Sequence, residues 1–101
     1  MSLPVIARPE ADEDLAEVHD WYENKRVGLG DEFLDSADKF FERIVTFPEL
    51  YAIVMKNVRR GKLDRFPYVV YYRVLSDKIE IVAVLHGRRD AKVWKRRIKS
   101  I

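Results

Sequence analysis

The segment "YVVYYRVLSDKIEIVAVLH" (residues 68–86) carries the clearest structural signal in the sequence, because it predicts two β-strands joined by a tight turn. Residues 68–75 and 78–86 are rich in β-branched and aromatic side chains, and Ser76-Asp77 between them is typical of a turn. Side chains alternate across a strand, so one face of the first strand should carry Tyr68, Val70, Tyr72 and Val74. By the same alternation, one face of the second strand should carry Ile79, Ile81, Ala83 and Leu85. The segment therefore predicts a hairpin with an apolar face that other elements can cover.

Shorter elements are predicted on both sides of this hairpin. Residues 58–66 ("VRRGKLDRF") predict a strand before it, and the short links between the three strands indicate an antiparallel meander. A short apolar run at residues 3–8 predicts one further strand. After the hairpin, residues 90–98 ("DAKVWKRRI") predict a closing helix with Asp90 as its N-cap. The inward face of that helix should carry Val93, Trp94 and Ile98.

Two amphipathic helices are predicted between the first strand and the meander. Residues 9–26 begin with a proline and several acids, which favour a helix N-terminus, and residues 31–47 end before Pro48. The "VGLG" segment (27–30) between them indicates an antiparallel helical hairpin. The apolar stripes of the two helices are Ala11, Leu15, Val18 and Tyr22, and Phe33, Ala37, Phe40, Phe41 and Ile44. The sequence thus predicts one α+β domain over residues 1–101, with a sheet of about four strands.

Composition narrows the class of protein. A chain of 101 residues with 48% hydrophobic content can form a core, and the lack of cysteine excludes disulfides and thiolate zinc sites. No apolar run is long enough to span a membrane, so we expect a cytoplasmic protein with no membrane partner. Residues 1–50 hold 5 Lys/Arg and 13 Asp/Glu, a net charge of −8, whereas residues 51–101 hold 14 and 4, a net charge of +10. Such asymmetry either solvates one domain or provides a basic surface for an acidic protein or a nucleic acid.

The chemistry-bearing residues give few catalytic signals. His19 and His86 are the only histidines and fall in different predicted elements, so we expect neither a metal site nor a cofactor. His19 and Glu23 have the spacing of an ordinary helix pair. The basic residues of the meander can converge at one sheet face or end, where guanidinium groups suit phosphate or carboxylate. An RNA-cleaving site built from them would use His86 for proton transfer.

Several strings resemble the RelE/ParE superfamily of type II toxins, closest to the ParE-type plasmid stabilisation proteins. They are "EADEDLAEVHDWYE", "GLGDEFL", "VRRGKLDRFPYVVYYRV" and "AVLHGRRD" followed by a tryptophan, and together they span roughly residues 3 to 98. The resemblance implies a bacterial toxin neutralised by a cognate antitoxin, whose extended, often acidic segment wraps it. ParE members poison DNA gyrase, whereas RelE members cut messenger RNA in the ribosome.

Residue-by-residue comparison favours the ParE branch. Basic groups of the RelE-type ribonucleases are matched here by Arg60, Lys62 and Arg88. However, a RelE arginine falls at Val69, and the C-terminal RelE tyrosine falls at Trp94, which has no hydroxyl. His86 could compensate only in part, because the tyrosine that accompanies such a histidine in some relatives is missing.

Three functions follow from this resemblance. The first is a ParE-like inhibitor of DNA gyrase that is not an enzyme. The second is a ribosome-dependent mRNA endoribonuclease with Arg60, Lys62, His86 and Arg88 as catalytic candidates. The third is a non-toxic relative that only binds antitoxin, and the chain would form either a homodimer or a hetero-oligomer with the antitoxin. The residues expected to contact the target or the antitoxin's carboxylates are Arg59, Arg60, Arg65, Arg73, Arg88 and Arg89.

Overall fold

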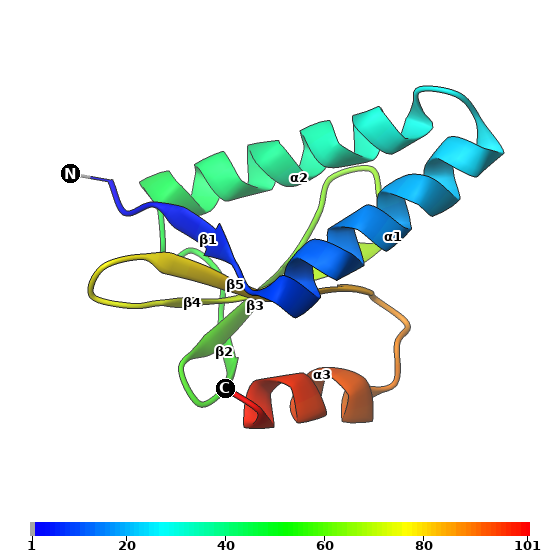
Figure 1. Cartoon of the computed structure of the whole chain (residues 1–101). Helices are drawn as coiled ribbons and strands as arrows, with labels where there is room; N and C mark the ends of the chain where they lie inside the picture. The colour runs from blue at the N-terminus through cyan, green and yellow to red at the C-terminus, as the bar shows by residue number, and fades with distance from the viewer. Residues whose placement is uncertain (1) are drawn as a thin grey trace.

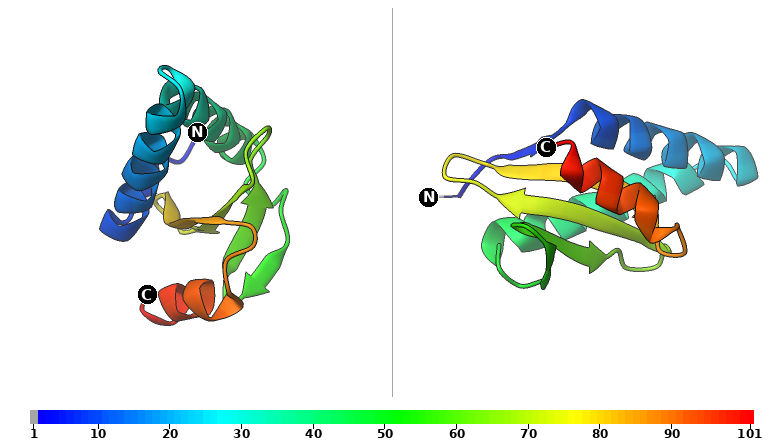
Figure 2. Two further views of the ribbon diagram at one scale, coloured as in Figure 1. Left: turned by 90° about the vertical axis from the view of Figure 1, so that its right-hand side faces the viewer. Right: turned by 90° about the horizontal axis from the view of Figure 1, so that it is seen from below.

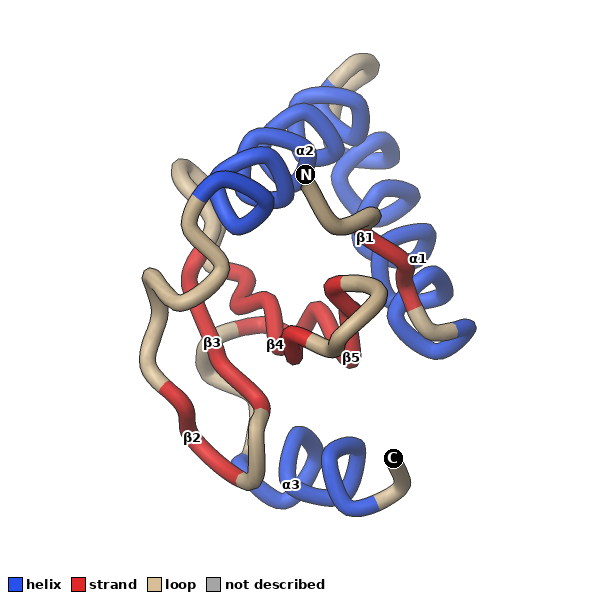
Figure 3. Tube along the Cα trace, turned by 90° about the vertical axis from the view of Figure 1, so that its left-hand side faces the viewer, coloured by secondary structure: helices blue, strands red, loops and turns tan. Residues whose placement is uncertain are grey.

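The hairpin of β4 (Tyr68–Val74) and β5 (Ile79–His86) forms the centre of a five-stranded sheet in the computed structural model, which describes residues 2–101 (Figure 1). The strand order is β1-β5-β4-β3-β2, where β1 is Val5–Ala7, β2 is Ile53–Met55 and β3 is Val58–Lys62. Strand β1 is parallel to β5, and the other neighbours are antiparallel. The helices α1 (Pro9–Lys25) and α2 (Leu29–Thr46) cover one face, and α3 (Ala91–Lys99) covers the other (Figures 2 and 3). The predicted α+β architecture, with a helical hairpin and an antiparallel meander, is confirmed.

The alternation predicted for β4 is correct, but that for β5 is wrong in its second half. The register shifts by one residue, so that Tyr71 lies opposite Ala83 while Tyr72 lies opposite Ile81, and Val82 is left between them. Ile79 and Ile81 therefore pack under the helical hairpin, whereas Ala83 and Leu85 pack under α3. Period-two alternation could not predict this, because every side chain from Ile79 to Leu85 is buried and after Glu80 only apolar residues follow, so none of them marks a face.

The sheet has one strand more than expected. β2 (Ile53–Met55) pairs with β3 (Val58–Lys62) at the outer edge, and its three residues are too few for a sequence pattern. The strand predicted at residues 58–66 is also too long, because the chain turns after Lys62 and Arg65 adopts a φ of 69°. β3 contains Gly61, where a Cβ would lie 2.7 Å from the ring of Tyr51. The absence of a side chain at this position therefore lets the loop before β2 pack against the sheet.

A short turn joins the two long helices. Helix α2 begins at Leu29, two residues earlier than predicted, directly after its N-cap Gly28, whose φ is 89°. The Glu23 carboxylate accepts hydrogen bonds from the N–H groups of Gly28 (2.9 Å) and Gly30 (3.0 Å) and so satisfies donors at the start of α2. His19 contacts not Glu23 but Asp20 (3.0 Å) and Asp31 (3.3 Å), which corrects the predicted helix pair. Both hydrogen bonds raise the pKa of His19, and the bond to Asp20 has the larger effect.

The C-terminal helix α3 is held by both apolar and polar contacts. The Asp90 carboxylate accepts the N–H of Lys92 at 2.8 Å, which confirms Asp90 as the N-cap. Trp94 stacks on Tyr71 with ring centroids 5.6 Å apart, and Ile98 is fully buried. The predicted inward face of α3 is therefore confirmed, and it closes a second core on the side of the sheet opposite α1 and α2.

Candidate functional site

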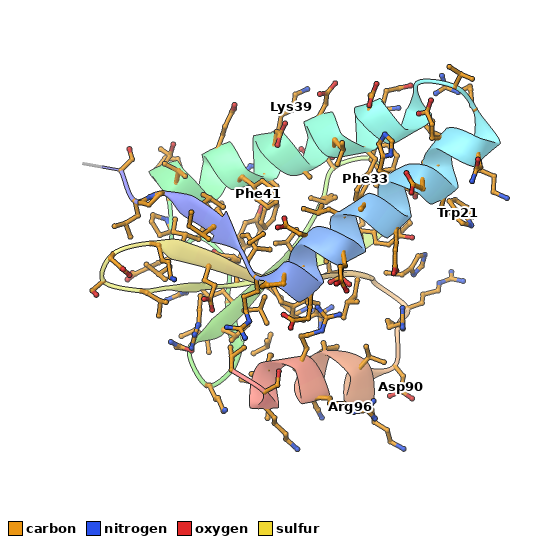
Figure 4. All side chains as sticks on the ribbon, viewed as in Figure 1. Trp21, Phe33, Lys39, Phe41, Asp90 and Arg96 are labelled. Carbon is orange, nitrogen blue, oxygen red and sulfur yellow. The ribbon has the colours of Figure 1, made fainter. Side chains whose placement is uncertain are left out.

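A small cleft lies between α1 and the C-terminal end of β5. Its volume is about 210 Å³, and the polar and aromatic side chains that line it are Asp14, Glu17, Trp21, Tyr68, His86 and Arg89. The cleft forms because β1 pairs only with Ile79 to Ile81, so the rest of β5 has no strand on the side opposite β4. Helix α1 crosses this open stretch, and Trp21 extends from it on the side that faces the β5–α3 loop (Figure 4).

His86 sits at the mouth of this cleft in a defined orientation. Its ring makes an edge contact with Tyr68, with centroids 5.3 Å apart, and its Nδ1 atom accepts the backbone N–H of Arg88 at 3.0 Å. An accepting Nδ1 leaves the neutral imidazole proton on Nε2. Burial raises the pKa of the Tyr68 hydroxyl, and the charge of Arg89 partly opposes that rise. The cleft thus combines aromatic surface with one guanidinium and two carboxylates.

An ion pair between Asp14, which lines the cleft, and Arg97 connects α1 near the start of the chain with α3 near its end. The Asp14 carboxylate accepts hydrogen bonds from both terminal nitrogens of Arg97, at 2.9 and 3.1 Å, and from the backbone N–H of Val84 at 3.0 Å. Arg97 donates in addition to the carbonyl of Val82 at 3.2 Å. Next to the register shift, the Val84 N–H and the Val82 carbonyl lack a strand partner. Side chains therefore supply their hydrogen bonds. Its hydrogen bonds to Asp14 raise the pKa of Arg97 above its usual range.

Three of the six arginines predicted to bind a partner are engaged inside the fold. Arg59 donates to the carbonyl of Tyr51 at 2.8 Å. Arg65 donates to Glu32 at 3.0 Å, and the Nε of Arg73 donates to the nearly buried carboxylate of Glu80 at 2.8 Å. Their guanidinium groups hold loops and strands together. A partner that bound these arginines would have to compete with the contacts they make within the protein. The sequence alone could not reveal these contacts.

The remaining candidates fall on two sides of the sheet. Arg60 lies over the rings of Tyr71 (5.4 Å) and Trp94 (5.9 Å), on the face covered by α3. Lys62 shares this face by strand alternation and donates to the carbonyl of Leu63 at 3.0 Å. His86 faces α1 across the cleft, so the sheet separates it from Arg60 and Lys62.

Arg88 and Arg89 lie in the exposed loop between β5 and α3. Neither forms an ion pair with any of residues 2–101. Among the six predicted arginines, these two are therefore exposed without an ion pair, whereas the exposed Arg65 is paired with Glu32.

Sequence reasoning missed the aromatic wall of the cleft. Trp21 is 54% exposed on a helix that is otherwise polar on its outer side, and Tyr68 lies opposite His86. A tryptophan outside the predicted apolar stripe was the available signal, because Trp often occurs at interfaces, where its ring can be buried by a partner.

Two further observations limit the chemistry of the part of the chain that the structure describes. Among residues 2–101, no three His, Asp or Glu side chains gather as a metal ion would require. None of the helices in this range is both long enough and apolar enough to cross a membrane.

Comparisons with known proteins place this architecture in a family. The sequence profile of the ParE toxin of type II toxin-antitoxin system, parDE, matches residues 5–91. The solved chromosomal ParDE TA system from P. aeruginosa contains a chain with a TM-score of 0.61 and 18% identity, covering 84% of this chain and 96% of that one. A mutant of the E. coli toxin RelE in the free state gives a TM-score of 0.71 at 13% identity, covering 100% and 99%.

No curated protein sequence matches the chain. The two structural neighbours are too distant in sequence to show more than a shared fold, whereas the profile covers most of the chain. This protein belongs to the ParE toxin family of type II toxin–antitoxin systems.

Proposed function

We propose that this protein is the toxin of a type II toxin–antitoxin module, that it inhibits DNA gyrase, and that a cognate antitoxin neutralises it. The observation that carries the proposal is the family match over residues 5–91. An inhibitor that is not an enzyme needs only a surface that binds its target. Its function therefore does not require the catalytic candidates to lie in one cluster.

The division of the basic residues supports inhibition over RNA cleavage. A ribonuclease must bring a proton-transfer group and phosphate-stabilising cations to one phosphodiester. His86 lies on the α1 side of the sheet, whereas Arg60 and Lys62 lie on the α3 side. Trp94, at the position of the RelE tyrosine, is stacked on Tyr71 and offers no hydroxyl. Catalysis by this set would require a rearrangement of the strand ends.

The β5–α3 loop and the cleft beside it form the surface we assign to the target. Arg88 and Arg89 are exposed there, and Trp21 and His86 border the same cleft. Arginine and tryptophan are the residue types that contribute most binding free energy when a partner buries them. This surface therefore combines cationic contacts with an aromatic anchor.

The antitoxin would bind the apolar surface at the other end of the molecule. We define the α2–β2 apolar patch as Phe47, Leu50 and Ile53, which are 60%, 54% and 52% exposed. Beside it, a hollow of about 490 Å³ is lined by apolar side chains of β1 and α2 and rimmed by Asp38 and Glu42. Because β2 is an edge strand, an amphipathic antitoxin segment could pair with β2 and cover the α2–β2 apolar patch with its own apolar side chains.

A supercoiling assay with purified gyrase tests this proposal. The antitoxin-free protein should block supercoiling of relaxed plasmid, and adding the antitoxin should restore it. Arg88→Ala combined with Arg89→Ala should weaken the inhibition, because two exposed cations are lost from the target surface. Lys39→Ala combined with Lys56→Ala is the matched control, since both lysines are exposed and lie outside the cleft. Normal supercoiling at a large molar excess of folded toxin would contradict the proposal.

One observation favours keeping the ribonuclease as a second candidate. Arg60 and Lys62 lie together on one sheet face, as the resemblance to RelE toxins implies. Primer extension on ribosome-bound message would then show codon-positioned cuts, and His86→Ala and Arg88→Ala proteins should lose them. Absence of both cleavage and gyrase inhibition, with antitoxin binding intact, would indicate the non-toxic relative instead.

A further inference from the structure

The outward face of α3 carries a row of positive charges that the proposed gyrase inhibition does not use. We define the α3 basic ridge as Lys92, Lys95, Arg96 and Lys99, whose spacing places them on one side of the helix. All four residues are exposed, and together they line a shallow hollow of about 380 Å³. Figure 4 shows Arg96 pointing away from the sheet.

The ridge does not stabilise the monomer through ion pairs. None of its four residues pairs with a carboxylate anywhere in residues 2–101. Lys92 and Arg96, like Lys95 and Lys99, are like charges four positions apart, which destabilise a helix. Lys92 also lies in the first turn, where the helix dipole disfavours a cation. The helix dipole favours Arg96 and Lys99 in the last turn, but the repulsion between neighbouring ridge cations is relieved only when an anionic ligand binds.

The opposite face of α3 holds the ridge in place. Ile98 is buried, Trp94 is stacked on Tyr71, and Arg97 is bonded to Asp14 on the far side of the sheet edge. A ligand would therefore meet cations that are already ordered on a fixed helix, and less conformational entropy would be lost on binding. Because the apolar face is used by the core, α3 has no free apolar stripe to insert into a lipid bilayer.

We infer that the α3 basic ridge binds the phosphate backbone of duplex DNA without sequence preference. From Lys92 to Lys99 the helix advances roughly 10 Å at 1.5 Å per residue. Duplex DNA presents one negative charge per about 1.7 Å of its axis, so several phosphates lie within reach of four cations. An α-helix also fits the width of the major groove, about 12 Å.

The composition of the ridge favours a nucleic-acid duplex over single strands and over acidic proteins. Single-stranded nucleic acids bind through aromatic rings on which bases stack, and the aromatic residue of α3, Trp94, already stacks on Tyr71. Three of the four ridge cations are lysines, whose ammonium groups bind phosphate as point charges with little geometric selectivity, so binding should be independent of sequence. An acidic protein partner would normally also require an apolar centre in the interface, and the four ridge side chains provide none.

Binding can be measured by fluorescence anisotropy with a labelled 20-base-pair duplex and the full chain. The ridge variant is Lys92→Gln, Lys95→Gln and Lys99→Gln together. The control variant is Lys25→Gln, Lys39→Gln and Lys56→Gln, which removes the same charge from exposed positions outside α3. Circular dichroism checks that both variants are folded. The assay contains no gyrase, so its failure leaves the proposed inhibition untouched, and a failed supercoiling assay leaves this inference untouched.

The expected result is a salt-dependent affinity that only the ridge variant loses. Four phosphate contacts predict a slope of about −3.6 for log K against log salt, or roughly a 150-fold loss between 50 and 200 mM salt. The ridge variant should bind at least about 10-fold more weakly at 50 mM salt, with a slope reduced by about 2.7. The slope of the control variant should differ from that of the wild type by no more than the loss of about one phosphate contact would cause.

Four outcomes would overturn the inference. They are no measurable binding by the wild-type protein, equal losses in the ridge and control variants, tighter binding to a single strand of the same length, and tighter binding to polyglutamate than to the duplex. The third would reassign the ridge to single-stranded nucleic acid, and the fourth would reassign it to an acidic polypeptide.

Discussion

Replacing Asp14 by alanine should destabilise the protein far more than its place on a helix surface would indicate. The Asp14 and Arg97 side chains are only 12% and 20% exposed, and the carboxylate accepts three hydrogen bonds from Arg97 and Val84. The substitution leaves a largely buried guanidinium without its counterion and a backbone N–H without an acceptor. Removing one partner of such a pair costs about 3–5 kcal/mol.

Thermal unfolding followed by circular dichroism measures this effect. One kcal/mol shifts the Tm of a domain of about 100 residues by about 4–8 °C, so Asp14→Ala should lower Tm by at least about 12 °C. Asp38→Ala is the matched control, because it removes the same side chain from an exposed helical position that forms no ion pair within residues 2–101. The control should change stability by no more than about 0.5 kcal/mol.

A double variant separates loss of the ion pair from loss of packing. Arg97→Met keeps most of the aliphatic stem and removes the charge, so Asp14→Ala with Arg97→Met contains no unpaired buried ion. We expect the double variant to be more stable than Asp14→Ala alone. The reasoning is refuted if Asp14→Ala melts within about 2 °C of the wild type, which corresponds to less than about 0.5 kcal/mol. It is also refuted if the two substitutions destabilise additively, because residues in direct contact should show a coupling free energy.

Three other predictions concern packing, pH and partner binding. Gly61→Ala should cost about 1–3 kcal/mol in urea unfolding through overpacking, whereas Gly87→Ala, where the nearest atom to a Cβ lies 3.5 Å away, should cost less than about 0.5 kcal/mol. Because the pKa of His19 is raised in the folded state, the stabilisation by His19 is complete below about pH 6.5 and is lost as the pH rises through the folded pKa. The wild type should therefore exceed His19→Gln in free energy of unfolding by more at about pH 5.5 than at about pH 8. An equal difference at the two pH values would contradict this. Phe47→Ser should abolish antitoxin binding in calorimetry with little change in Tm, while Val27→Ser, 88% exposed and distant from the α2–β2 apolar patch along the chain, should bind normally.

The elements whose signals are local were predictable from the sequence. Apolar residues at helical spacing placed Phe33, Phe40 and Ile44 in the core, and Asp90 was predicted as the cap that the structure shows. The alternation in β4 also placed its two faces correctly. Each of these features depends on backbone geometry within a few residues, so neighbouring side chains carry enough information.

The candidate site depended on contacts between distant parts of the chain. Asp14 and Arg97 are 83 positions apart and each belongs to a charged helix, so nothing in the sequence distinguishes them from the solvated charges beside them. The same holds for the arginines: Arg73 is bonded to Glu80 while Arg88 remains exposed, although both lie in similarly basic segments.

The shift at Val82 had the largest consequence for the site. One additional residue in β5 reverses the faces of the residues that follow, and so His86 points toward α1 while Arg60 remains under α3. The amino-acid pattern alone established the family, the helices and the central hairpin. The tertiary structure alone decided which charges pair and which face each basic residue occupies, because strand register and ion pairing depend on surfaces that meet only after the chain has folded.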